Sequence, residues 1–139
     1  MAITQSMCTS FKVEVLGGIH DLDTDVIKVA LYLSSATLGA GTTAYTTSGE
    51  TTGAGYSAGG NTLTGAVISF GGTTAFASFS QTIFSGASFT TRGALIYNSS
   101  KANRAIAVLD FGGDQVVSSG DFVIVFPTAD ATDAIIRIA

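Results

Sequence analysis

The chain has few residues of the kinds that carry chemistry at protein sites. Among 139 residues it contains one histidine, one cysteine, one proline and no tryptophan, and only 12% of its residues are charged. The single Cys8 excludes an internal disulfide, and we interpret it as a small buried hydrophobic residue. A Ser-His-Asp site would have to use His20, yet the sequence has no Gly-x-Ser-x-Gly motif. We interpret His20 as a structural residue of a turn and expect no enzyme.

Basic residues are also scarce. The net charge is −4, from six basic and ten acidic residues. The basic residues are scattered over the chain, at Lys12, Lys28, Arg92, Lys101, Arg104 and Arg137. Since a nucleic-acid site needs a stripe of such residues along the phosphates, we expect no nucleic-acid partner. A surface made mostly of Thr, Ser, Gly and Ala is easier to understand if partner proteins cover much of it.

Long apolar runs are absent as well. No segment reaches the roughly 18 consecutive apolar residues of a membrane-spanning helix. The first ten residues, MAITQSMCTS, have neither the basic start nor the apolar centre of a signal peptide. We therefore expect no export signal and no membrane partner.

The residues that are present favour short strands. Apolar residues make up 46% of the chain, and 17 glycines supply turns. The clearest segment is residues 89–111, in which the apolar runs 93–97 (GALIY) and 105–109 (AIAVL) flank a polar connection typical of a hairpin. In each run the residues at odd and at even positions, which point to opposite faces of a strand, are all apolar. We therefore expect this hairpin to be buried on both faces at the centre of a two-layer β structure.

Residues 4–16 are predicted to form a short helix. Thr4 could cap it, Met7, Phe11 and Val15 recur at intervals of four, and the glycine pair 17–18 offers a left-handed exit. An alternative is a strand, because apolar and charged residues also alternate over residues 11–15.

Further strands are predicted along the rest of the chain. One face of residues 26–33 is aliphatic and the other mixed, so this strand is expected to border solvent or a partner. The chain is expected to turn at Gly71-Gly72 and at Gly112-Gly113-Asp114, and residues 122–126 are expected to be buried on both faces. The remaining strands are expected at 63–70, 74–80, a short piece at 82–84, a separate strand that leads from Ser88 into the central hairpin, and 134–138, where Arg137 points outward. The fold class is thus mainly β: one antiparallel β-sandwich or jelly-roll domain, residues 1–139, of about eight strands with one short N-terminal helix.

Residues 34–61 form a long Gly, Thr and Ser-rich segment, which we call the arm. Its only bulky residues are Leu38, Tyr45 and Tyr56. A connection of this length is either a functional extension or contains an overlooked strand, here around residues 42–47. We expect an extended arm anchored by its tyrosines.

Three alternating carboxylates, Asp21, Asp23 and Asp25, match the opening of a calcium-binding loop. The match ends there, because Val26 stands where such a loop needs glycine and Tyr32 where it needs a bidentate glutamate. We interpret the segment as a solvated acidic turn and expect no metal ion.

Other motifs are equally weak. Residues 53–59 (GAGYSAG) have the glycines of a dinucleotide loop but neither its spacing nor a strand and helix around it, so we expect no cofactor. Residues 98–100 match a glycosylation acceptor and are interpreted as a turn. The remaining carboxylates lie in or beside turns, where aspartate is common, and form no recognisable catalytic pair.

Three segments carry a resemblance to a known family: MAITQSMCTSFKVEVLGGIHD at the start, RGALIYNSSKANRAIAVLDFGGD in the hairpin, and FPTADATDAIIRIA at the end. Together they resemble small virion structural proteins of tailed bacteriophages, over most of the chain. Within that group the chain is most similar to jelly-roll capsid cement, or decoration, proteins on the outside of an HK97-type shell. The resemblance implies a virion location, contacts with the major capsid protein and with copies of the chain as a dimer or trimer, and no catalytic or binding motif.

The least sandwich-like parts, residues 4–16 and the arm, are expected to make these contacts. Their bulky residues Met7, Phe11, Tyr45 and Tyr56 are the predicted partner interface. One alternative function is a head–tail connector or tail component. Another, of a different class, is a carbohydrate-binding β-sandwich, which the absence of tryptophan disfavours.

Overall fold

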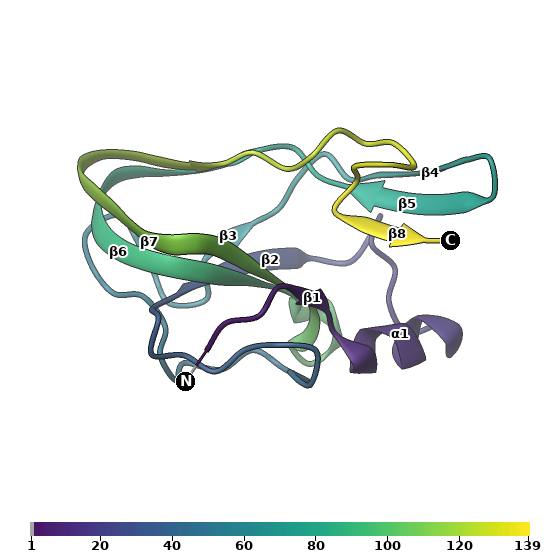
Figure 1. Ribbon diagram of the computed structural model, residues 1–139, viewed down its shortest axis with the longest axis horizontal. Helices are drawn as coiled ribbons and strands as arrows, with labels where there is room; N and C mark the ends of the chain where they lie inside the picture. The colour runs from purple at the N-terminus through teal and green to yellow at the C-terminus, as the bar shows by residue number, and fades with distance from the viewer. Residues whose placement is uncertain (1) are drawn as a thin grey trace.

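The computed structural model describes residues 2–139 and folds them mainly as antiparallel β-structure (Figure 1). Its elements are β1 (Ser6–Met7), α1 (Thr9–Leu16), β2 (Ile27–Tyr32), β3 (Asn61–Thr62), β4 (Val67–Gly71), β5 (Thr74–Ser78), β6 (Thr82–Asn98), the 3-10 helix η1 (Ser99–Lys101), β7 (Arg104–Ile124) and β8 (Ile136–Ile138). A five-stranded sheet has the order β1-β7-β6-β2-β3 and a three-stranded sheet the order β4-β5-β8. The prediction of a mainly β fold with about eight strands and one short N-terminal helix is confirmed, and the jelly-roll topology stays a prediction.

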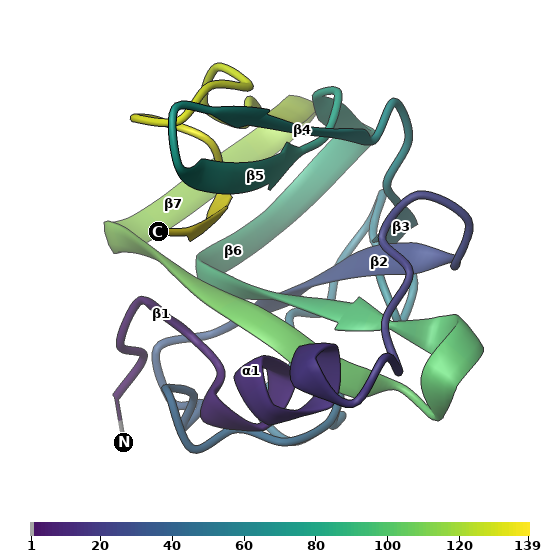
Figure 2. The same cartoon turned by 90° about the vertical axis from the view of Figure 1, so that its right-hand side faces the viewer.

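The β6–β7 hairpin is the longest feature of the structure. Its register runs from Thr82 opposite Ile124 to Asn98 opposite Arg104, so it contains the predicted central hairpin and extends well beyond it. Ala102 and Asn103 close the tip with positive φ angles of 56° and 58°, in the left-handed region that short polar residues tolerate best. Both strands bend sharply near their middle (Figure 2).

The bend coincides with an interruption of the ladder. Between the pairs Gly93–Asp110 and Thr91–Gln115, β7 advances five residues while β6 advances two, so β7 carries three extra residues. The prediction that residues 112–114 reverse the chain is therefore wrong. Gly112, with φ +83°, lies in a bulge, and an irregularity of this kind bends paired strands without ending them.

The arm covers the side of β2 that was expected to face solvent or a partner. Ala30 and Tyr32 lie on that side and are fully buried. The Tyr32 hydroxyl donates a 2.6 Å hydrogen bond to the carbonyl of Thr46 in the arm. The expectation for β2 was wrong because the sequence pattern of one strand does not reveal what a distant segment places over it.

The N-terminal helix begins later than predicted. Ser6 and Met7 instead form β1, which pairs with Val108 and Ala107 of β7. The helix therefore starts at Thr9, with buried Cys8 at the N-cap position and no side-chain capping bond. The predicted glycine exit is confirmed, because Gly18 adopts φ +74°.

Several strand boundaries also differ from the prediction. The strand expected at residues 63–70 begins only at Val67, as β4, because Gly65 before it adopts φ +64°; the short β3 lies outside the predicted range. Residues 82–84 and the segment from 88 belong to one strand, β6. The last strand is shorter than expected, and its Arg137 is exposed as predicted.

The segment 122–126 is buried on one face only, not on both as predicted. Ile124 and Phe126 are buried, whereas Val123 and Val125 are exposed. Among residues 2–139, the small sheet packs on one side of this part of the hairpin, and Val123 and Val125 lie on the other (Figure 2).

The buried apolar residues form one cluster that draws on both sheets, α1 and the arm. Before its last residue, Asn61, which begins β3, the arm contains no strand but adds isolated bridges to β2, β6 and β7, at Glu50, Ala54 and Ala44 respectively. Thr51 in its middle is 1% exposed and donates a hydrogen bond to the carbonyl of Thr90. The predicted extended arm is thus a packed layer of the core.

The closeness of the arm to β2 gives a test of this packing. Gly60 has φ +76°, and a Cβ atom there would overlap the carbonyl oxygen of Val29. We expect Gly60→Ala to lower the free energy of unfolding by about 3 kcal/mol, from left-handed strain and overpacking together. Gly112→Ala is the matched control: its φ is +83° but its Cβ would meet open space, so a loss of only about 1 kcal/mol is expected. Urea unfolding of both variants measures the difference, and equal losses would contradict the tight packing.

Candidate functional site

The four residues of the predicted partner interface fall into two separate pairs. Met7 of β1 and Phe11 of α1 line the same apolar groove, where Met7 is half-buried and Phe11 is buried. Tyr45 and Tyr56 of the arm meet at one carboxylate, that of Glu50. Their proposed contact with a partner protein stays a prediction.

Glu50 is a charged residue, 8% exposed, around which the arm closes. Its Oε1 accepts a 2.7 Å hydrogen bond from the Tyr45 hydroxyl. Its Oε2 accepts bonds from the Tyr56 hydroxyl, at 2.5 Å, and the backbone N–H of Gly59, at 2.8 Å. A buried carboxylate is costly unless it is bonded in this way, so the three donors explain how the arm tolerates it.

The two tyrosines are held as donors. Burial, together with the neighbouring Glu50 carboxylate, raises the pKa of both Tyr45 and Tyr56 far above the ordinary tyrosine value. Tyr45 stacks on Tyr97 with ring centroids 4.8 Å apart, and the Tyr56 hydroxyl also accepts the backbone N–H of Leu31 in β2. The cluster therefore clamps the arm to the sheet with neutral hydroxyls and a single charge.

Sequence reasoning missed Glu50. The available signal was that Glu50 is the one charged residue between positions 34 and 61, in a segment otherwise made of small and polar residues. An isolated acidic residue among tyrosines is compatible with an exposed loop as well as with a buried clamp, so its role depended on the fold.

A second polar cluster surrounds His20. Its Nε2 lies 2.8 Å from Glu14 and its Nδ1 lies 3.0 Å from the side-chain nitrogen of Asn98. The ring also packs on Phe11 at 5.0 Å. Both ring nitrogens are engaged, and Glu14 also pairs with Arg104, so the histidine ties α1 to the hairpin tip.

The acidic turn before β2 is less solvated than predicted. Asp21 accepts the backbone N–H groups of Asp23 and Thr24, as an exposed turn residue would. Asp25 instead turns inward, where it accepts bonds from Asn98 at 2.7 Å and Lys101 at 2.9 Å. The carboxylates therefore fasten the turn to the hairpin tip and do not converge on one point.

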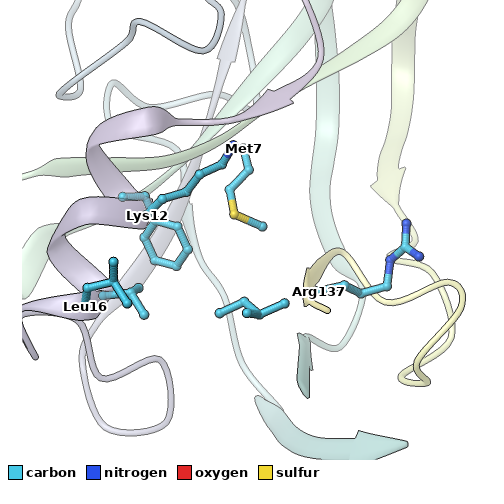
Figure 3. Close-up of a pocket in the computed structure, with 7 residues that line it drawn as sticks. Met7, Lys12, Leu16 and Arg137 are labelled. Carbon is cyan, nitrogen blue, oxygen red and sulfur yellow. The ribbon is translucent and has the colours of Figure 1, made fainter. Parts of the chain in front are cut away.

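An apolar groove separates α1 from the small sheet. Its first part, about 410 Å³, has Met7, Lys12 and Leu16 on one side and Arg137 and Ile138 of β8 on the other (Figure 3). A second part, about 390 Å³, continues between the helix exit and the sheet face and shares Phe11, Val15 and Ile138 with the first.

Apolar side chains are exposed both in this groove, which Leu16 and Ile68 line, and on the surface beside it. Leu16 and Val13 of α1 are 90% and 65% exposed, and Phe70 and Ile68 of β4 are 74% and 53% exposed. No charged residue and no histidine occurs from residue 51 to residue 91, the stretch that supplies β3, β4, β5 and half of β6. Exposed apolar area of this kind usually marks a surface that a partner covers.

The β4 part of this apolar surface was not predicted to contact partners, whereas Val13 and Leu16 lie in the segment 4–16 that was. The signal was present in the sequence as the uncharged stretch 51–91. It was not used because alternating apolar residues in a strand are normally assigned to a core.

Comparisons with models of protein families, with curated proteins and with solved structures find no match to this chain. Among residues 2–139, no helix is long and apolar enough to cross a membrane.

The Glu50 clamp can be tested by truncation. We expect Glu50→Ala to lower the free energy of unfolding by about 3 kcal/mol, because it leaves two buried hydroxyls and one backbone N–H without their acceptor. Glu50→Gln keeps an acceptor oxygen and should cost clearly less. Urea unfolding followed by tyrosine fluorescence gives both values. A Glu50→Ala protein as stable as wild type would show that water replaces the carboxylate without cost.

The Asp25 contacts predict an acid-dependent stability. The hydrogen bond from Asn98, with further help from the backbone of Asp21 and from Lys101, lowers the pKa of Asp25 from 3.8 to about 2. Because the folded pKa lies below the unfolded one, this contribution is complete above about pH 4 and disappears as the pH falls towards 2. Asp25→Asn should therefore reduce stability at neutral pH and converge with wild type near pH 2.

The matched control for this titration is Asp23→Asn, in the same turn but exposed. Because this side chain is exposed, its substitution should lower the free energy of unfolding at neutral pH by clearly less than Asp25→Asn does. A constant difference between wild type and Asp25→Asn across the acid range would contradict the pKa argument.

Proposed function

We propose that this protein is a structural component of a tailed-bacteriophage virion, a capsid cement protein bound to the outside of an HK97-type shell. Its partners are the major capsid protein and neighbouring copies of itself. The observation that carries the proposal is the apolar surface formed by the uncharged strand β4 and by Val13 and Leu16 of α1, joined to a body in which the buried polar side chains are hydrogen-bonded internally. The resemblance to small phage virion proteins supports it independently.

The surface suits a partner of large size. Covering Ile68 and Phe70 removes apolar area from water, and the stretch 51–91 that supplies their strand contains no charge, so the desolvation cost of docking on β4 is low. A contact that is weak for one copy becomes durable when each copy also holds its neighbour on the shell. Non-covalent cementing needs many such equivalent contacts and no reaction.

The internal bonding supports a passive role. Both candidate polar clusters, at Glu50 and at His20, have their donors and acceptors directed at one another. A catalytic group must have a lone pair or proton free for substrate, and these groups use theirs to hold the arm and the hairpin tip. We therefore assign the clusters to rigidity and include no chemical step in the proposal.

Copy number in the particle tests the proposal. In purified virions of the phage that encodes this sequence, quantitative mass spectrometry against the major capsid protein should find on the order of hundreds of copies, as the symmetry of a shell requires. About six or twelve copies would identify a head–tail connector or tail component instead. Absence from the particle, with binding to a glycan array, would favour the carbohydrate-binding alternative and overturn the virion proposal.

A further inference from the structure

β4 is an edge strand without the usual protection. It lies at the end of the order β4-β5-β8, and four of its five residues are exposed. Its sequence, VISFG, contains no charged residue and no proline. Natural edge strands usually carry such residues, or a covering segment, to prevent pairing with another chain, so an open apolar edge of this kind is suited to accept a strand.

The backbone of β4 has hydrogen-bonding groups available along this edge. The β4–β5 turn has two residues, Gly72 and Thr73, between the pair Gly71 and Thr74, and Gly72 adopts φ +60°. In a two-residue hairpin of this type the closing pair, here Gly71 and Thr74, exchanges hydrogen bonds. From there back along β4, the N–H and C=O groups of successive residues point alternately away from β5 and towards it. The N–H and C=O groups of Ile68 and Phe70 therefore point away from β5, along the free edge.

Charge favours a second copy of this chain as the strand that pairs there. Each copy carries a net charge of −4, so two copies repel one another when their charged parts face each other. The stretch 51–91, which supplies β4 and β5, has no charge, so pairing through β4 brings no charged side chains of these strands together. The acidic residues Asp130 and Asp133 flank Ala131, which packs beside Gly71 at the end of β4 and not at its middle residue, Ser69. Among the described strands, the other edges are shorter: β1 and β3 have two residues each and β8 has three.

We propose that β4 pairs antiparallel with β4 of a second copy about a two-fold axis at Ser69. In this register Ile68 of each copy lies opposite Phe70 of the other, on the same face, where aromatic and β-branched side chains make favourable cross-strand pairs. Ser69 lies opposite itself on the other face, and its small side chain allows close approach. The two three-stranded sheets become one continuous sheet. The β4 edges of both copies are occupied by one another, so no third copy can join at β4 and the contact closes at a dimer.

This inference deepens the proposed function, because it rests on the need for copies to contact one another and names the surface that they use. Two five-residue edges bury less area than the roughly 1,600 Å² of a standard interface. We therefore expect a dimer that forms as concentration rises and not a permanent one. Tests on the isolated protein are independent of copy number in the virion, so the two proposals can fail separately.

Sedimentation velocity over a concentration series tests the dimer. The wild-type protein should shift from monomer towards dimer as its concentration rises. Ser69→Asp places two carboxylates opposite each other at the axis and should remain monomeric with an unchanged circular dichroism spectrum. Ser118→Asp, on an exposed position of β7, is the matched control and should behave as wild type. The proposal would be overturned if the wild-type protein remained monomeric at every concentration, or if Ser69→Asp associated as strongly as wild type.

Disulfide trapping tests the register. The Ser69 pair is non-hydrogen-bonded, with Cβ atoms about 4.5–5.5 Å apart, which a small shift brings within disulfide range. Under mild oxidation Ser69→Cys should form a disulfide-linked dimer. Wild type, whose Cys8 is buried, and Ser118→Cys should not do so at the same concentration. Trapping of Ser69→Cys no faster than Ser118→Cys would contradict a two-fold axis at this residue.

Discussion

The pairing of β6 with β7 is the interaction on which the rest of the structure depends. The two strands remain paired from the tip at Asn98 to Thr82, although a bulge bends them in the middle. The tip half forms the centre of the large sheet, since β2 adds to β6 and β1 adds to β7. Phe84 and Phe126, from the other half and from its continuation, belong to the same core cluster, which also includes Ile136 of the small sheet. One long-range ladder therefore positions both sheets.

Two charged clusters tie the remaining segments to this ladder. Glu50 holds the arm through Tyr45 and Tyr56, and His20 with Glu14 holds the helix to the hairpin tip. Both are buried or half-buried polar networks whose members are bonded to one another, and such networks favour one arrangement over others because any shift would leave a buried group unbonded. The arm is consequently as firmly placed as a strand, although it lacks strand geometry.

The distribution of charge divides the molecule into two functional parts. The ion pairs at Glu14, Asp25 and Asp110 all involve residues outside the stretch 51–91. That stretch presents apolar side chains and an open strand edge, the features that a protein needs to associate with copies of itself and with a larger assembly. Internal hydrogen bonding of the polar groups and the exposed apolar strand together fit the proposed structural role.

Local patterns in the sequence determined the fold class, the two-sided burial of the central hairpin and the glycine turn before β5, because each depends on residues close together in the chain. They also determined that the surface would carry little charge. Tertiary structure alone decided that residues 112–114 form a bulge and not a turn, that Ser6 and Met7 pair with β7, and that the arm is core. It also decided that Glu50 is buried while Phe70 is exposed. Each of these outcomes depends on which distant segment supplies a hydrogen-bond partner or a covering side chain, and no periodicity in the neighbouring residues encodes that choice.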